Sequence, residues 1–324
     1  MQVKALGGRM KKNYPLLIIL ILLSIISLFI GAKEVSIKGI LNFNNDDVQI
    51  LILSRIPRLL SIIVAGMGMS ISGLIMQQIS QNKFVSPTTA GTIDSAKLGI
   101  LVTLIFMPTS STMAKMLISF AFALAGSFLF LGILKKVKHR GTIIIPLVGI
   151  MLGNVMDSMT TFLAYRMDMI QNITAWLQGD FSMVIKGRYE LLYITIPFVL
   201  LAFLYANKFT LAGMGEDFST NLGLNYNRIV RLGLVIVSII SASVIITVGR
   251  IPFLGLIIPN IVSLYRGDNL KKNIVPTILL GSSFLLFCDI LGRLIIYPYE
   301  IPISLTVGVL GSIIFIYLLF RRNR

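Results

Sequence analysis

Apolar residues fall into long runs along this chain, separated by short polar connections. A membrane-spanning helix needs about 20 mostly apolar residues, or fewer when tilt and neighbouring helices help. The pattern therefore predicts an all-α polytopic membrane protein with about ten transmembrane helices. The predicted spans are residues 15–32, 57–79, 85–107, 113–134, 142–165, 190–207, 229–249, 252–265, 274–296 and 302–320.

The run at 252–265 is shorter than the others, and Gly255, Pro259 and Asn260 interrupt it. This pattern predicts a short, broken helix. Irregular backbone at membrane depth is tolerated only where protein or a water-filled cavity covers it. Because transporters build their central sites from such helices, the run favours a transport function.

Composition supports the membrane assignment and excludes several other classes. Hydrophobic residues make up 56% of the chain and charged residues only 13%, whereas a soluble domain has about 25% charged residues. The single cysteine, Cys288, excludes an internal disulfide, and with the single histidine, His139, it excludes a usual metal site. No other cofactor is expected. The sequence also has no phosphate-binding loop and no nucleophile set, so we expect a transport subunit and not an enzyme.

The net charge of +16 is distributed as in membrane proteins. Basic residues cluster in short connections beside helix ends, which is the positive-inside pattern and does not indicate a nucleic-acid partner. Their bias predicts a multi-pass protein of the cell membrane with both termini in the cytoplasm. Residues 1–14 are expected to be a cytoplasmic segment and residues 15–324 a single transmembrane domain, because the first apolar run lacks a signal-peptide cleavage site.

Polar residues inside the predicted spans are candidates for lining a translocation path. Asp94 and Lys97 are three residues apart on one helical face and could form an ion pair. Asp157 and Asn260 are the other two candidates. Asp157 has three hydrogen-bonding neighbours on its own helix, which are Asn154, Ser158 and Thr161. The alternative for these charges is a structural ion pair between helices.

A short helix is predicted within the long connection at 207–228. Its candidate residues are Gly215, Glu216, Asp217, Phe218, Leu222 and Gly223. Glycines bound the segment, acidic residues occupy its first turn, and Phe218 and Leu222 share one apolar face. Such a helix either docks to a cytoplasmic partner or lies on the membrane surface.

Three arginines lie at the predicted external ends of helices. Arg55 and Arg58 belong to the motif RIPR before the second span, and Arg293 follows Asp289 by four residues in the ninth span. The two arginines of the motif are placed to meet acidic groups from outside. For Asp289 and Arg293, an ion pair within the helix is the default expectation.

Several collinear segments resemble one family, the FecCD-type permease subunits of ABC importers for iron–siderophore complexes, haem and cobalamin. They are RIPRLLSIIVAGMGMSISGLIMQQISQNKFVSP (55–87), AWLQGDFS (175–182), GEDFSTNLGLNYNRIVRL (215–232), VGRIPFLGLIIPNIVSLYRGDN (248–269), LLFCDILGRLI (285–295) and EIPISLTVGVLGSIIFIYLLFRR (300–322). Together they cover nearly the whole chain from residue 50 onward.

The resemblance implies ten helices per subunit and a homodimer, or a heterodimer with a similar permease, around a central pathway in membrane lipid. It also implies cytoplasmic ATP-binding subunits and an extracytoplasmic substrate-binding protein. The family's coupling helix falls on residues 215–224, and its docking arginines fall on Arg55, Arg58 and Arg293. The most similar members import ferric siderophores, which is therefore the expected function.

The chain departs from the family pattern at three places. Asn260 stands where the family usually has histidine, Arg250 stands where it often has a small residue or proline, and Asp94 with Lys97 replaces a neutral stretch. These changes leave haem or cobalamin open as the ligand. A secondary transporter that uses Asp94, Lys97 and Asp157 as an ion relay also stays open.

Overall fold

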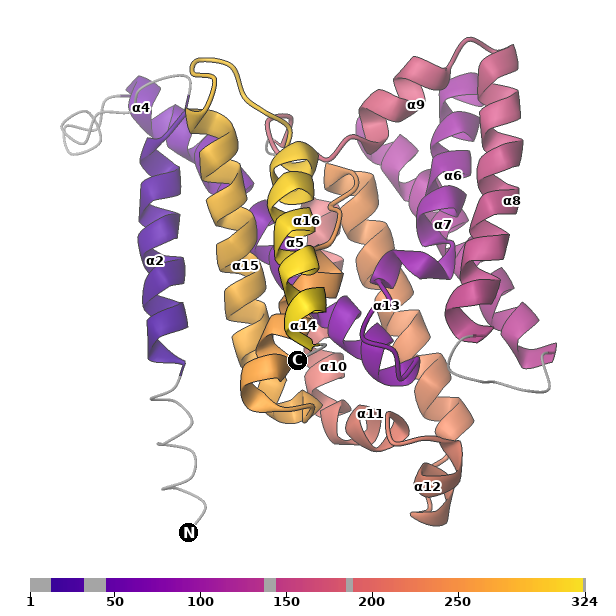
Figure 1. Ribbon diagram of the computed structural model, residues 1–324. Helices are drawn as coiled ribbons and strands as arrows, with labels where there is room; N and C mark the ends of the chain where they lie inside the picture. Colours follow the sequence, from indigo (N-terminus) through magenta and orange to yellow (C-terminus); the bar gives the residue numbers. More distant parts are fainter. Residues whose placement is uncertain (1–12, 32–44, 137–143, 185–188, 323–324) are drawn as a thin grey trace.

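The computed structural model describes residues 13–31, 45–136, 144–184 and 189–322, and every regular element within these ranges is a helix (Figure 1). This confirms the all-α prediction for the described part of the chain. Most of the predicted N-terminal segment, and the connection that carries His139, lie outside it. The helices are α2 (Tyr14–Phe29), α4 (Asn45–Ile50), η1 (Leu51–Arg55), α5 (Ile56–Ile79), η2 (Pro87–Ala90), α6 (Thr92–Phe106), α7 (Thr112–Lys136), α8 (Ile144–Arg166), α9 (Ile170–Leu177), η3 (Glu190–Ile194), α10 (Thr195–Leu204), α11 (Ala206–Ala212), α12 (Glu216–Asn221), α13 (Tyr226–Val248), α14 (Leu254–Arg266), α15 (Leu270–Leu294) and α16 (Ile303–Arg322).

Each of the ten predicted runs contains a helix, but the count of ten spans is not confirmed. Among the described residues, six helices are long and apolar enough to cross a membrane, or seven if η3–α10 and α11, bent by 65°, form one span. The remaining predicted spans are short: α2 has 16 residues, α14 has 13, and α6 has 15 with two charges among them. A single helix of that length does not cover the hydrocarbon thickness.

The two ends of the bundle carry different elements (Figure 1). We call the end with α11 and α12 the inner end and the end with α9 the outer end. α2 begins and α16 ends toward the inner end, as expected for an even number of crossings. Which end faces the cytoplasm stays a prediction.

The core forms around α5 and α13, whose most apolar stretches are each 78% buried. Small residues let other backbones approach α5 closely. A Cβ on Gly66 would lie 2.7 Å from the Ser282 Cα of α15, and a Cβ on Gly73 would lie 1.7 Å from the Gly255 carbonyl oxygen of α14. The small-residue pattern of the second span is therefore a packing feature.

α14 is the short, broken helix that the sequence predicts. Phe253, whose φ of +60° is left-handed, immediately precedes it, and Pro259 lies inside it. Proline has no N–H, so the carbonyl four residues earlier, at Gly255, loses its helical donor. Gln77 Nε2 of α5 donates to this carbonyl at 3.4 Å and to the Leu256 carbonyl at 3.0 Å. A protein side chain thus supplies the hydrogen bonds that the broken helix cannot form within itself.

Candidate functional site

A cavity of about 550 Å³ at the outer end is lined by two of the charges that the sequence places inside the membrane, Lys97 and Asp157. Its wall is formed by residues of α6, α8 and α9, by the segment before α14, and by the first turn of α16. The lining residues are Lys97, Asp157, Ile173, Thr174, Leu177, Gln178, Gly179, Arg250 and Ser304.

The ion pairs around this cavity differ from the predicted pair between Asp94 and Lys97, which is not formed. Lys97 Nζ instead contacts Asp157 Oδ1 of α8 at 2.7 Å and Thr161 Oγ1 at 2.8 Å. Asp94 Oδ1 faces Arg250 Nη2 at 4.0 Å. The i, i+3 spacing put both charges on the correct face of α6, but that face meets opposite charges from other elements. Thr161, predicted to hydrogen-bond Asp157, accepts a hydrogen bond from Lys97 Nζ.

Close backbone packing fixes these partners in place. A Cβ on Gly153 of α8 would lie 2.5 Å from Asp94 Oδ2, so a larger residue there would displace the Asp94 carboxylate. Gly249 has a φ of +82°, and a Cβ on it would lie 2.5 Å from the Gln178 carbonyl oxygen. Arg250 N then donates to the Leu177 carbonyl at 2.9 Å. The backbone of Arg250 is therefore held against the end of α9.

The three outer arginines, which the sequence predicts to dock a binding protein, are buried. Arg55 and Arg58 are each 8% exposed, and Arg293 is 2% exposed. Arg58 donates to Asp289 Oδ1 at 2.7 Å and to Glu300 Oε2 at 2.6 Å, and Arg293 pairs with Asp289, as the i, i+4 spacing predicts. Because these guanidinium groups are buried and already paired, they present little surface to the acidic side chains of a binding protein.

Arg55 and Arg293 also hold the end of α2. Arg293 Nη1 donates to the Ser27 carbonyl at 3.0 Å and to the Ile30 carbonyl at 2.7 Å. Arg55 Nη1 donates to the same Ile30 carbonyl at 2.7 Å. The last carbonyls of a helix lack intrahelical donors, so arginines are suitable caps there. This cluster therefore fastens α2, α5 and α15 together at the outer end.

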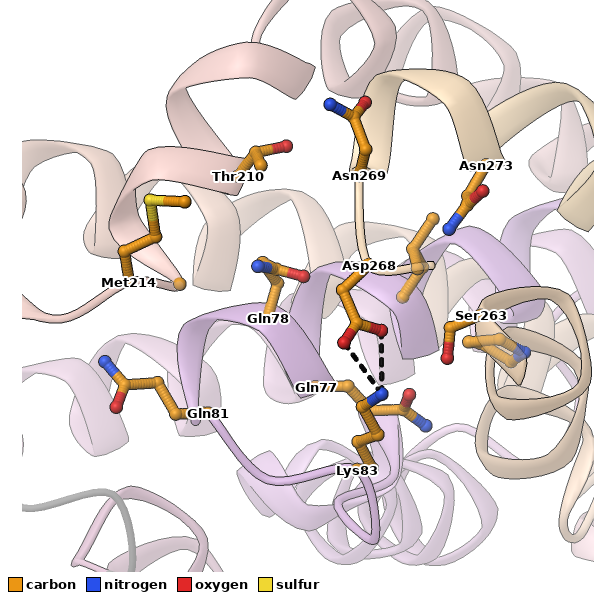
Figure 2. A pocket seen from close by; sticks show the side chains of 13 residues that line it. Gln77, Gln78, Gln81, Lys83, Thr210, Met214, Ser263, Asp268, Asn269 and Asn273 are labelled. Carbon is orange, nitrogen blue, oxygen red and sulfur yellow. Dashed lines mark hydrogen bonds and ion pairs between the residues drawn. The ribbon is translucent and has the colours of Figure 1, made fainter. Parts of the chain in front are cut away.

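The inner end has a second cavity, of about 400 Å³, whose lining includes several side-chain amides and hydroxyls (Figure 2). Its polar lining residues are Gln77, Gln78, Gln81, Lys83, Thr210, Ser263, Asp268, Asn269 and Asn273. Lys83 Nζ bridges to both carboxylate oxygens of Asp268 at 2.7 and 2.9 Å. Sequence analysis missed this cavity, although the amide-rich run QQISQN after an apolar helix was a usable signal.

The predicted inner helix is present as α12, directly beside this cavity. Gly215, with a φ of +108°, precedes it, Gly223, with a φ of +78°, follows it, and Glu216 and Asp217 occupy its first turn. Phe218 is 49% exposed and Leu222 is 58% exposed. An apolar face thus projects from the inner end without a partner within the described chain.

The junction before α12 packs directly on the end of α5. A Cβ on Gly213 would lie 2.0 Å from Gln78 Nε2, and a Cβ on Gly215 would lie 3.5 Å from Gln81 Nε2. A displacement of α12 therefore reaches the amide side chains that line the inner cavity.

Asn260 lies on α14 near the inner end and has a structural role in the described chain. Its Nδ2 donates to the Lys83 carbonyl at 2.7 Å and to the Leu256 carbonyl at 2.8 Å. The segment that contains it runs between the two cavities, since Arg250 lines the outer one while Pro259 and Ser263 line the inner one. Asn260 itself lines neither, so its assignment to the path stays a prediction.

Charges that line cavities at both ends of an apolar helical bundle, together with a broken helix between them, are typical of polytopic membrane transport proteins. The FecCD transport family matches residues 18–321. The chain therefore belongs to this family.

Individual relatives are similar along nearly their whole length. Petrobactin import system permease protein YclN from Bacillus subtilis is 60% identical, and the match covers 97% of this chain and 99% of YclN. Ferric-anguibactin transport system permease protein FatD from Vibrio anguillarum is 40% identical, with 91% and 94% covered. A solved structure described as an inward-facing metal-chelate type ABC transporter has the same fold, with a TM-score of 0.85 at 23% identity over 96% of this chain and 99% of that one.

Proposed function

We propose that this chain is the permease subunit of an ABC importer for a ferric siderophore, with petrobactin as the first ligand to test. One observation carries the proposal: 60% identity to a petrobactin import permease over 97% of the chain. A second petrobactin permease, from Bacillus anthracis, is 40% identical over 95% of the chain. These relatives favour a siderophore over haem or cobalamin.

The proposal includes the partners that such an importer needs. A second permease, the same chain or a similar one, completes the pathway, ATP-binding subunits dock at the inner end, and a binding protein delivers the ligand at the outer end. α8 and α16 support this assembly, because only 22% of the most apolar stretch of each is buried. Faces of this kind contact lipid or another subunit.

A secondary transporter with an ion relay is the weaker alternative. The three relay candidates, Asp94, Lys97 and Asp157, each face an opposite charge, so no single unpaired carboxylate marks an ion-binding position. This alternative predicts transport that depends on membrane potential and continues without an ATPase.

For the outer arginines we propose an indirect role in docking. Arg58, Asp289 and Arg293 fix the outer ends of α5 and α15, and the binding protein then meets the surface that these helices support. Direct pairing of Arg55, Arg58 and Arg293 with the binding protein would require the cluster to open first.

Uptake tests the function directly. Expressed in Bacillus subtilis lacking YclN, the chain should restore uptake of radiolabelled iron as ferric petrobactin, because the two permeases are similar along their whole length. Uptake of iron hydroxamates, which have a separate permease in that organism, should not change. If the chain reaches the membrane at normal levels and ferric petrobactin uptake stays absent, the proposed ligand is wrong.

Orientation can be tested by labelling single cysteines. Ser182 is exposed near the outer end, and Asn221 is exposed on α12, whereas the neighbouring Ser219 is fully buried and unsuitable. In a Cys288→Ser background, an impermeant thiol reagent on intact cells should label S182C and spare N221C. Permeabilised cells should show labelling of both. Labelling of N221C alone on intact cells would reverse the proposed orientation.

A further inference from the structure

Arg250 differs from the other charges of the outer cavity because its guanidinium is only loosely engaged. Its side chain is 47% exposed, and its ion pair with Asp94 spans 4.0 Å, longer than a hydrogen bond. Lys97, by contrast, is 16% exposed and makes two contacts of 2.7 and 2.8 Å. The cavity therefore holds one cation with donors available to a ligand.

The place of this cation also fits a ligand in transit. The cavity lies between helices that carry apolar membrane-facing surfaces, where a half-exposed charge is costly unless it faces water or protein. Its volume of about 550 Å³ is within the common range for small-molecule sites. The Arg250 backbone follows Gly249, whose φ of +82° suits glycine, and donates to the Leu177 carbonyl, so the side chain starts from a fixed point on the cavity wall.

We propose that Arg250 binds an anionic oxygen of the ferric chelate as it passes through the outer cavity. This inference rests on the proposed function and adds the chemical class of the ligand group. Ferric complexes of catecholates and hydroxycarboxylates carry net negative charge, whereas complexes of three hydroxamates are neutral. The planar guanidinium fork meets a carboxylate with two parallel hydrogen bonds, so Arg250 selects for the anionic class.

Asp94 gives the site a way to release its ligand. A transported ligand must bind well enough to enter and weakly enough to leave. Asp94 lies 4.0 Å from the guanidinium and competes with the ligand for it. Removing this competitor with Asp94→Asn should strengthen ligand binding and slow turnover.

The test uses the complete complex of permease, ATPase and binding protein in proteoliposomes. Arg250→Gln should lower the rate of ferric petrobactin uptake about tenfold or more, the usual effect of losing a charge-assisted hydrogen bond. Arg250→Lys, which keeps the charge, should retain most of the uptake. Lys115→Gln, which removes a positive charge elsewhere near the outer end, should have no effect. In all three variants, the loaded binding protein should stimulate ATP hydrolysis about as much as in the parent.

A binding measurement provides an independent readout. Trp176, the single tryptophan of the chain, is next to Leu177 of the cavity wall. Ferric catecholates absorb light in the region of tryptophan emission, so ferric petrobactin should quench this emission, with Trp176→Phe as the blank. The quenching midpoint should rise about tenfold in Arg250→Gln and fall in Asp94→Asn.

Two results would overturn the role of Arg250. Uptake and quenching equal to the parent in Arg250→Gln would show that the cation does not contact the chelate. Loss of ATPase stimulation with an unchanged quenching midpoint would assign Arg250 to docking or assembly instead. A parent complex that imports no ferric petrobactin contradicts the proposed function, whereas a functional parent with an unaffected variant contradicts only this inference.

Discussion

Asp289→Asn should destabilise the permease more than any other single substitution considered for this chain. Asp289 is 3% exposed and accepts from two buried arginines, Arg58 and Arg293. Asparagine keeps the shape but removes the negative charge, so Arg58 and Arg293 lose the carboxylate that they share. Breaking a buried ion pair by removing one partner typically costs about 3–5 kcal/mol. We expect a large drop in the thermal unfolding temperature in detergent and in the yield of intact protein.

Asp268→Asn is the matched control. Asp268 also forms an ion pair with a residue far away in the sequence, Lys83. The Lys83 and Asp268 side chains are 36% and 60% exposed, so the pair stabilises the fold by only about 0–1 kcal/mol. The control should unfold close to the parent temperature. Equal unfolding temperatures for both variants and the parent would show that the buried cluster does not stabilise the outer end.

The same cluster explains why the sequence predicted the helices better than the roles of the charges. Helix positions follow from runs of apolar residues, which local sequence reveals. Arg58 lies in a short motif at a helix start, where sequence alone suggests exposure. Its acceptors, Asp289 and Glu300, are 231 and 242 residues away, so only the folded structure brings them together.

Spacing within one helix predicted the Asp289–Arg293 pair correctly, although Arg58 of α5 shares the same carboxylate, but it did not predict the partners of Asp94 and Lys97. Asp289 and Arg293 form their i, i+4 pair because both face the same buried junction. Asp94 and Lys97 have comparable spacing, yet Asp157 of α8 and Arg250 of the segment before α14 attract them instead. Spacing gave the correct face of α6, and the identity of the neighbouring helices decided the partners.

The lengths of the short helices were also hard to predict from the sequence. The apolar runs that contain α2 and α14 look like those of the longer helices, but their helices have only 16 and 13 residues. The left-handed residues Phe253 and Gly267 bound α14, and Gln77 compensates for the carbonyl that Pro259 leaves without a donor. A long-range amide of this kind is not visible in the local sequence.

Truncating Phe218 and Leu222 together to alanine should uncouple ATP hydrolysis from transport. Both side chains project from α12 with about half of their surface exposed, whereas Ser219 on the same helix is buried and donates to the Leu211 and Gly215 carbonyls. The helix is thus fixed to the permease on one face and apolar on the other. Contact of the apolar face with a groove of the ATPase would be worth about 2–4 kcal/mol, enough to weaken assembly by more than tenfold when it is lost.

Thr220→Ala distinguishes loss of this apolar contact from general damage to α12. Thr220 is exposed on the same helix, and its hydroxyl contacts only the Glu216 carbonyl in the described structure. The control should assemble, and loaded binding protein should stimulate its ATP hydrolysis as in the parent. The double variant should lose that stimulation while the permease itself stays folded, because neither truncated side chain belongs to the core. Because Gly213 packs closely against Gln78 at the inner cavity, we expect a helix no longer held by the ATPase to lose its effect on α5. A double variant that transports and hydrolyses ATP like the Thr220→Ala control would show that α12 is not the coupling element.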